Sequence, residues 1–143
     1  MMMTLGLIAT VVLVAGCGAT KTSNRDIDFV NSDEAQALVG RRQNLVGKVS
    51  EGVWVDPRTE AAFAKKHLPG AINLPFQNVT DDHAMLDDYG TLVVYGDTFN
   101  DAKAQGMAKR LIELGHEDVH LLRGGIEAWM DLGLPVEGTD VVE

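Results

Sequence analysis

The chain has 143 residues, of which 45% are hydrophobic and 23% are charged, so it can bury the core of one folded domain and does not have the composition of a disordered protein. Its net charge of −9 excludes a general affinity for nucleic acids and for anionic lipid surfaces, because phosphate groups repel an acidic protein.

The first feature in chain order is an apolar segment, residues 5–15, with the sequence LGLIATVVLVA. At about 1.5 Å per helical residue it spans roughly 16 Å, half of the ~30 Å core of a bilayer, which is typical of a signal peptide and too short for a membrane span. The residues Val14-Ala15-Gly16-Cys17 resemble a bacterial lipobox, in which the cysteine is lipidated and becomes the first mature residue. We therefore predict a lipoprotein signal peptide over residues 1–16 and a lipidated Cys17 with a polar tether over residues 17–26.

This resemblance implies an exported protein, lipid-anchored to the cell envelope, with its domain on the periplasmic or extracellular face. The membrane is then a partner through Cys17. Because Cys17 is the only cysteine, a lipid on its sulfur leaves no thiol for a disulfide or for catalysis. The alternative interpretation of the segment is a buried strand that ends in a structural cysteine.

The rest of the chain, residues 27–143, alternates predicted strands with predicted helices. Apolar runs predict strands at residues 27–30, 53–55, 71–74, 92–95 and 119–122. Helical spacing and capping residues predict helices at residues 31–39, 60–66, 102–114 and 126–132, the first with Ser32 as its cap. Residues 76–90 are acidic and predict a surface loop with one helical turn. Apolar strands such as LVVY are typical of a parallel sheet covered by helices on both faces.

Three motifs in this order resemble signatures of the rhodanese-like domain family. The first begins at Asp56-Pro57-Arg58 and continues through His67-Leu68-Pro69-Gly70-Ala71-Ile72-Asn73-Leu74-Pro75. The second is the strand at residues 92–95. The third runs from Leu114-Gly115-His116 through Leu122-Arg123-Gly124-Gly125 to Trp129. The match covers about residues 27–135. It implies a three-layer α/β/α rhodanese-like fold with a five-stranded parallel sheet.

The resemblance also implies a chemistry, which is sulfur transfer through a persulfide on a cysteine just after the fourth strand. The amides of the following helix would lower the pKa of that thiol, and the loop would hold an anionic substrate on its backbone N–H groups. In this sequence the cysteine position falls on Gly96. The active-site-like loop comprises Gly96, Asp97, Thr98, Phe99, Asn100 and Asp101.

This loop lacks the group that the chemistry requires. Glycine has no side chain to carry sulfur, and the hydroxyl of Thr98 cannot store a sulfane sulfur. The carboxylates of Asp97 and Asp101 repel an anion such as thiosulfate. We therefore predict no catalytic residue in the loop, and a loss of sulfurtransferase activity.

Other charged residues are candidates for the rim of a pocket. They are Asp56, Arg58, His67 and Arg123, each of which has a structural alternative: a strand-end ion pair, a packed histidine or a tight turn. The spacing of His83, His116 and His120 indicates no metal site, and the acidic residues 81–88 are interpreted as a solvated face. We predict neither a metal nor a cofactor.

Three functions are compatible with the sequence. The leading hypothesis is an envelope lipoprotein whose non-catalytic domain binds an envelope protein or a small ligand. The second is a sulfurtransferase that uses an unconventional residue or the cysteine of a partner. The third is a structural envelope lipoprotein. An open hollow at residues 96–101 would favour binding, whereas a loop closed by its own side chains would favour the structural role.

Overall fold

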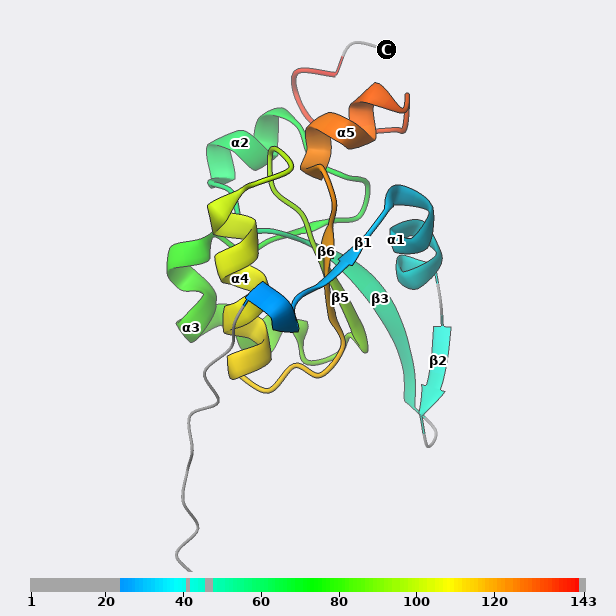
Figure 1. Ribbon diagram of the computed structural model, residues 1–143, viewed down its shortest axis with the longest axis vertical. Coiled ribbons are helices and arrows are strands. Elements are labelled where there is room, and N and C mark those ends of the chain that lie inside the picture. The colour runs from blue at the N-terminus through cyan, green and yellow to red at the C-terminus, as the bar shows by residue number, and fades with distance from the viewer. Residues whose placement is uncertain (1–23, 41, 46–47, 142–143) are drawn as a thin grey trace, which may run out of the picture.

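A computed structural model describes residues 24–40, 42–45 and 48–141 of the chain (Figure 1). The predicted signal peptide and Cys17 lie outside the described residues, as does most of the predicted tether. Within the described part of the chain, no helix is both long enough and apolar enough to cross a bilayer.

The centre of the molecule is a β-sheet in which the strands follow the order β1-β6-β5-β3-β2, with β4 paired to β3. All neighbouring strands are parallel except β2, which pairs antiparallel with the first part of β3. The strands are β1 (Asp28–Val30), β2 (Arg42–Leu45), β3 (Lys48–Asp56), β4 (Ile72–Asn73), β5 (Thr91–Val94) and β6 (Val119–Leu122). The predicted five-stranded parallel sheet is thus confirmed, and β2 is an addition that the apolar pattern did not predict.

Helices cover the two faces of this sheet, as the predicted three-layer fold requires (Figure 1). One face packs against α1 and α5, and the other packs against α3 and α4. The helices are α1 (Ser32–Val39), α2 (Glu60–Lys65), α3 (Val79–Asp82), α4 (Ala102–Glu113) and α5 (Gly125–Asp131), with short 3-10 helices η1 (Asn24–Asp26), η2 (Phe76–Asn78) and η3 (His83–Leu86).

Two local predictions were wrong. The cap of α1 is Asn31, whose side chain accepts hydrogen bonds from the amides of Asp33 and Glu34, whereas Ser32 is the first helical residue. Residues 76–90 are not a loop with a single turn but contain η2, α3 and η3 in succession. Val79 and Leu86 in this segment are buried, so apolar packing against the sheet holds it in helical form.

The core on the α1 and α5 side is built around aromatic rings. Trp54 on β3 meets Trp129 on α5 edge to face, with ring centroids 5.2 Å apart, and both residues are buried. The indole Nε1 of Trp129 donates to the carbonyl oxygen of Pro135 at 2.9 Å, so its polar atom has a partner. This packing fixes α5, and with it the turn that precedes α5, against the carboxyl ends of the parallel strands.

Candidate functional site

The loop after β5 lies at the carboxyl edge of the sheet and is held there by the first turn of α5. The amide of Ile126 donates to the carbonyl oxygen of Gly96 at 2.9 Å, and the amide of Glu127 donates to that of Asp97 at 3.1 Å. This close approach needs glycine at position 125, because a Cβ there would lie 2.5 Å from the Gly96 oxygen. Gly125 also has a φ of 62°, in the left-handed region that favours glycine. The backbone of the loop is therefore fixed by its neighbour.

The carboxylate of Asp101 closes the loop from inside. One oxygen, Oδ1, accepts from the amides of Lys103 and Ala104 at 2.8 and 3.1 Å and so caps α4. The other oxygen, Oδ2, accepts from the amide of Asp97 at 2.9 Å. These are the kind of amides with which a loop at a helix N-terminus holds an anion. Here the anion is part of the chain.

The space beside Gly96 is also filled by Asp101. A Cβ built on Gly96 would lie 2.5 Å from Cγ and Oδ2 of Asp101 and 2.6 Å from its Cβ, which is closer than atoms can approach. The backbone of Gly96 is not in the left-handed region, so its conformation does not exclude other residues. The side chain of Asp101 thus occupies the space that a nucleophile at position 96 would need.

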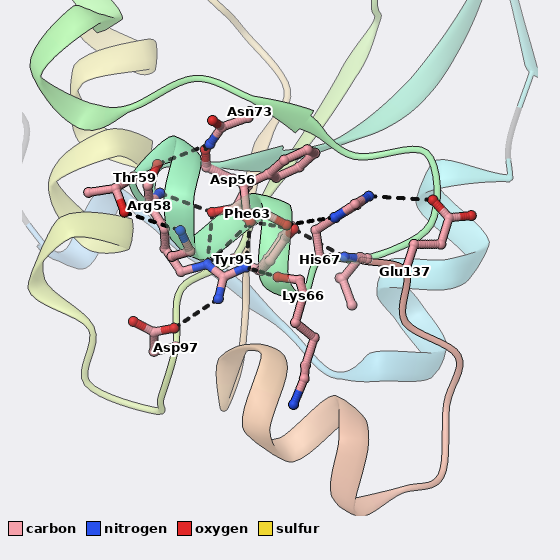
Figure 2. A network of polar contacts seen from close by, with 12 residues as sticks. Asp56, Arg58, Thr59, Phe63, Lys66, His67, Asn73, Tyr95, Asp97 and Glu137 are labelled. Carbon is pink, nitrogen blue, oxygen red and sulfur yellow. Dashed lines mark hydrogen bonds and ion pairs between the residues drawn. The ribbon is translucent and has the colours of Figure 1, made fainter. Parts of the chain in front are cut away.

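Next to this loop, Asp56 and Arg58 form a buried ion pair at the end of β3 (Figure 2). The Nε atom of Arg58 donates to Asp56 Oδ1 at 3.0 Å, and its Nη2 donates to Asp56 Oδ2 at 2.7 Å and to the carbonyl oxygen of Lys66 at 2.6 Å. Its Nη1 reaches Asp97 Oδ1 in the loop at 3.0 Å. These four contacts, made by the three nitrogens of one side chain, connect β3, the end of α2 and the loop.

Tyr95 completes the network from β5. Its hydroxyl donates to Asp56 Oδ2 at 2.6 Å and accepts from the amide of Leu68 at 3.2 Å. Burial, and then the negative charge of Asp56, raise the pKa of Tyr95 above its ordinary value of about 10. Burial acts to lower the pKa of Arg58, but the hydrogen bond and charge of Asp56 outweigh it and raise that pKa further. The site therefore holds a neutral phenol and a permanent cation.

The four predicted rim residues lie in three different places. Asp56 and Arg58 are buried and have their partners inside the protein. His67 stacks on Phe63, its Nδ1 lies 2.8 Å from the Phe63 carbonyl oxygen, and its Nε2 lies 3.4 Å from Glu137. Both ring nitrogens of His67 thus have partners within the protein, and the ring has a structural role.

Arg123 is the one of these four side chains that lines an open hollow. Its guanidinium lies over the rings of Phe29 and Phe99, 5.6 and 5.8 Å from their centroids. Beside it, between the start of α1 and α5, is a cavity of about 610 Å³. The lining comprises Asn31, Ser32, Asp33, Arg123, Ala128, Asp131, Leu132 and Leu134. This hollow adjoins the loop without including residues 96–101. It could not be predicted from local sequence patterns, because its lining comes from two distant segments.

Two histidines whose sequence spacing indicates no common site form a pair in the structure. His83 and His116 are 33 residues apart in sequence, yet Nδ1 of His83 lies 3.3 Å from Nε2 of His116. Burial, and then the neighbouring imidazole of His83, lower the pKa of His116, while Asp87 acts in the opposite direction. The pair forms because the segment before β5 and the segment before β6 lie next to each other in the folded chain.

Comparison with known proteins agrees with this fold. A family model for the rhodanese-like domain matches residues 33–132. The chain therefore belongs to the rhodanese-like domain family, as the three motifs predicted.

Relatives of the chain carry the name thiosulfate sulfurtransferase. The chain is 34% identical over 107 residues to the enzyme YnjE of Escherichia coli, a match that covers 63% of this chain and only 23% of YnjE. It is 27% identical over 112 residues to GlpE of Vibrio cholerae, where 77% of this chain and 94% of GlpE are covered. The structure of a thiosulfate sulfurtransferase from Pseudomonas aeruginosa aligns with a TM-score of 0.63 at 30% identity, over 78% of this chain and 20% of that chain.

Proposed function

We propose that this chain is a rhodanese-like domain without sulfurtransferase activity that binds a protein partner beside its closed loop, and that a lipid on Cys17 holds it at the cell envelope. One observation carries the first part. The carboxylate of Asp101 accepts from the Asp97 amide of the loop and from the amides of Lys103 and Ala104 in α4, and its side chain fills the space beside Gly96. A thiosulfate ion would have to displace an internal carboxylate from these amides, and no residue of the loop carries a thiol to receive its sulfur.

The assay for this part measures thiocyanate formation from thiosulfate and cyanide by the full-length protein. We expect no activity above buffer at any protein concentration. A sulfurtransferase with an intact cysteine, added to the same sample, controls for the reagents. Thiocyanate formation proportional to the concentration of the purified chain would overturn the proposal and favour the second candidate, a sulfurtransferase, which the names of the relatives support. That enzyme would need a cysteine from outside residues 24–141.

The closed loop argues against binding at residues 96–101 themselves, where an open hollow was the condition for a binding role. The binding part of the proposal is supported instead by a different hollow, the one beside Arg123. Its lining combines apolar Leu132 and Leu134 with one cation and with the carboxylates of Asp33 and Asp131. Mixed charges around an apolar floor suit a segment of a protein better than a small anion. Leu132, whose exposed fraction is 65%, and Phe99, at 56%, lie on this side of the molecule and offer apolar contact area.

A photo-crosslinking amino acid at position 132 of the lipidated protein, activated in its own membranes, tests this part. We expect one discrete adduct from position 132, and none from the same crosslinker at the exposed position 117 beyond the far end of α4. Equal labelling from both positions, or no adduct from position 132, would favour the third candidate, a structural lipoprotein.

The envelope location is tested separately through the anchor. Full-length protein should incorporate labelled fatty acid and remain with the membrane fraction, because lipoprotein modification adds more than one acyl chain. The Cys17→Ser variant should lose both properties. Undiminished acyl labelling in that variant would contradict the anchor without bearing on the closed loop.

A further inference from the structure

A group of three side chains with metal-binding atoms lies at the amino edge of the sheet, opposite to the loop after β5. His83 is the first residue of η3, Asp87 follows η3 directly, and His116 lies between α4 and β6. The first two come shortly before β5 and the third shortly before β6. Because these strands are parallel neighbours, the segments that enter them meet at the same edge of the sheet.

The distances within this group suit a metal ion. The atoms His83 Nδ1 and His116 Nε2 are 3.3 Å apart. One ligand atom from each of His83, Asp87 and His116 forms a set whose members all lie within 4.8 Å of one another. In a tetrahedral zinc site with bonds of about 2.0–2.1 Å, two ligand nitrogens are separated by roughly 3.3–3.4 Å. The histidine nitrogens already have this separation.

The burial of the three residues is also suitable. Both histidines are half-buried, and their rings are fixed at an interplanar angle of 89°. Asp87 is exposed, so its carboxylate can rotate toward the ring nitrogens without disturbing the core. Two imidazoles and one carboxylate form a ligand set that zinc and related ions prefer, whereas calcium and magnesium prefer oxygen ligands alone.

A hydrogen bond between the two rings is the competing explanation of the 3.3 Å distance, since one neutral imidazole donates and the other accepts. That explanation gives no role to the carboxylate of Asp87. We propose that His83, Asp87 and His116 bind one divalent transition-metal ion of the zinc type, with the fourth position left to water. The net charge of −9 favours the approach of a cation.

The position of the group indicates a structural role for this ion. The site lies at the edge of the sheet away from residues 96–101 and would tie η3 to the connection between α4 and β6. It would therefore stabilise the packing of η3 beside α4, without taking part in chemistry at the loop.

Calorimetric titration with Zn²⁺ tests the proposal on the full-length chain carrying Cys17→Ser, which removes a competing thiol. We expect one ion per chain and a rise in Tm as the Zn²⁺ concentration increases, because a ligand of the folded state stabilises it. His83→Gln and His116→Gln should each weaken binding at least about tenfold, and Asp87→Asn should weaken it several-fold, because each removes one of three ligands. Bound Co²⁺ should show the visible spectrum of a tetrahedral site.

Two substitutions serve as matched controls. His120→Gln removes another histidine that lies close to carboxylates, those of Asp28 and Asp118, and Asp81→Asn removes an exposed carboxylate of the same segment. Both should leave the affinity for Zn²⁺ within about twofold. No saturable binding, binding that persists when His83 and His116 are both replaced, or an equal loss in the controls would overturn the proposal.

A second measurement does not depend on the folding of any variant. Side-chain nitrogen NMR of the chain with histidines labelled should show Zn²⁺ shifting the resonances of His83 and His116 and sparing those of His67 and His120. Resonances of His83 and His116 that remain unchanged at saturating Zn²⁺ would show that the pair is only hydrogen-bonded.

Discussion

The two edges of the parallel sheet differ in how their polar side chains are paired. At the carboxyl edge, the Asp101 carboxylate accepts hydrogen bonds from three backbone amides. Arg58 donates hydrogen bonds to Asp56, Asp97 and the carbonyl oxygen of Lys66. At the amino edge, two imidazoles and a carboxylate point ligand atoms toward one another with a single contact of 3.3 Å between the rings. The edge at which this fold places its loop is thus internally satisfied, while the other edge holds groups suited to an added ion.

This difference shows how a familiar fold can keep the backbone of an anion-binding loop while a carboxylate of the same chain accepts from the amides there. An anion-binding loop works because its amides have no partner until the ligand arrives. When a side chain of the same loop supplies the anion, the helix remains capped and the backbone remains in place, so the fold loses nothing. Under the function proposed above, a partner would bind at another surface, the hollow beside Arg123.

The largest expected effect comes from breaking the buried network at the carboxyl edge. Arg58→Ala leaves the fully buried carboxylate of Asp56 without its cation, and removing one partner of a buried ion pair typically costs about 3–5 kcal/mol. We expect a loss of that size in the free energy of unfolding measured with urea. The control is Arg110→Ala, which breaks the exposed pair with Glu113 and should cost less than about 1 kcal/mol. Similar costs for the two variants would mean that the carboxyl edge is not held by this network.

A smaller effect is expected from a double-mutant cycle across the closed loop. Gly96→Cys places a Cβ against the side chain of Asp101, and overpacking of this kind costs about 1–3 kcal/mol. Asp101→Ala removes a helix cap at a cost of roughly 0.5–2 kcal/mol. In the double variant the new side chain occupies the vacated space. The destabilisation of the double variant should therefore be about 1–2 kcal/mol smaller than the sum of the two single destabilisations.

The control cycle pairs Gly96→Cys with Asn100→Ala, an exposed residue of the same loop. These two costs should add within about 0.5 kcal/mol, because the three atoms nearest to a Cβ at position 96 all belong to Asp101. Additive costs in the Asp101 cycle as well would show that the carboxylate does not fill the space beside Gly96.

Much of this fold could be predicted from local patterns. Apolar runs such as residues 92–95 identify buried parallel strands, and Asp101 before a helical stretch identifies the start of α4. The strand β2 could not be predicted in this way, because its sequence RQNL has no apolar run. Its extended conformation depends on backbone pairing with β3. The helical turns within residues 76–90 depend on the burial of Val79 and Leu86, which is a property of the assembled core.

The candidate site was predictable in its position but not in its contacts. Alignment to the family motifs places Gly96 where a nucleophile would stand, and charge alone indicates that Asp97 and Asp101 oppose an anion. The sequence does not reveal that Asp101 turns inward to take the Asp97 amide, or that Asp97 pairs with Arg58. Such contacts depend on rotamers and on neighbours distant in sequence, as does the meeting of His83 with His116.

The smallest expected effect is an alkaline one and concerns Tyr95 at the carboxyl edge. Its raised pKa means that the folded protein keeps the phenol proton at a pH where the unfolded chain loses it. The stabilisation is therefore complete below a pH of about 10 and declines as the pH rises further, by about 1.4 kcal/mol at pH 11. Tyr95→Phe should remove this decline while lowering stability at neutral pH through the lost hydrogen bond to Asp56. In the Tyr89→Phe variant, where Tyr95 is the only tyrosine, ultraviolet absorbance should show the phenol ionising well above pH 10, and together with unfolding. Ionisation of Tyr95 near pH 10 in the folded protein would mean that the network beneath the loop is open to solvent, and that the contrast between the two edges of the sheet is much weaker than the contacts indicate.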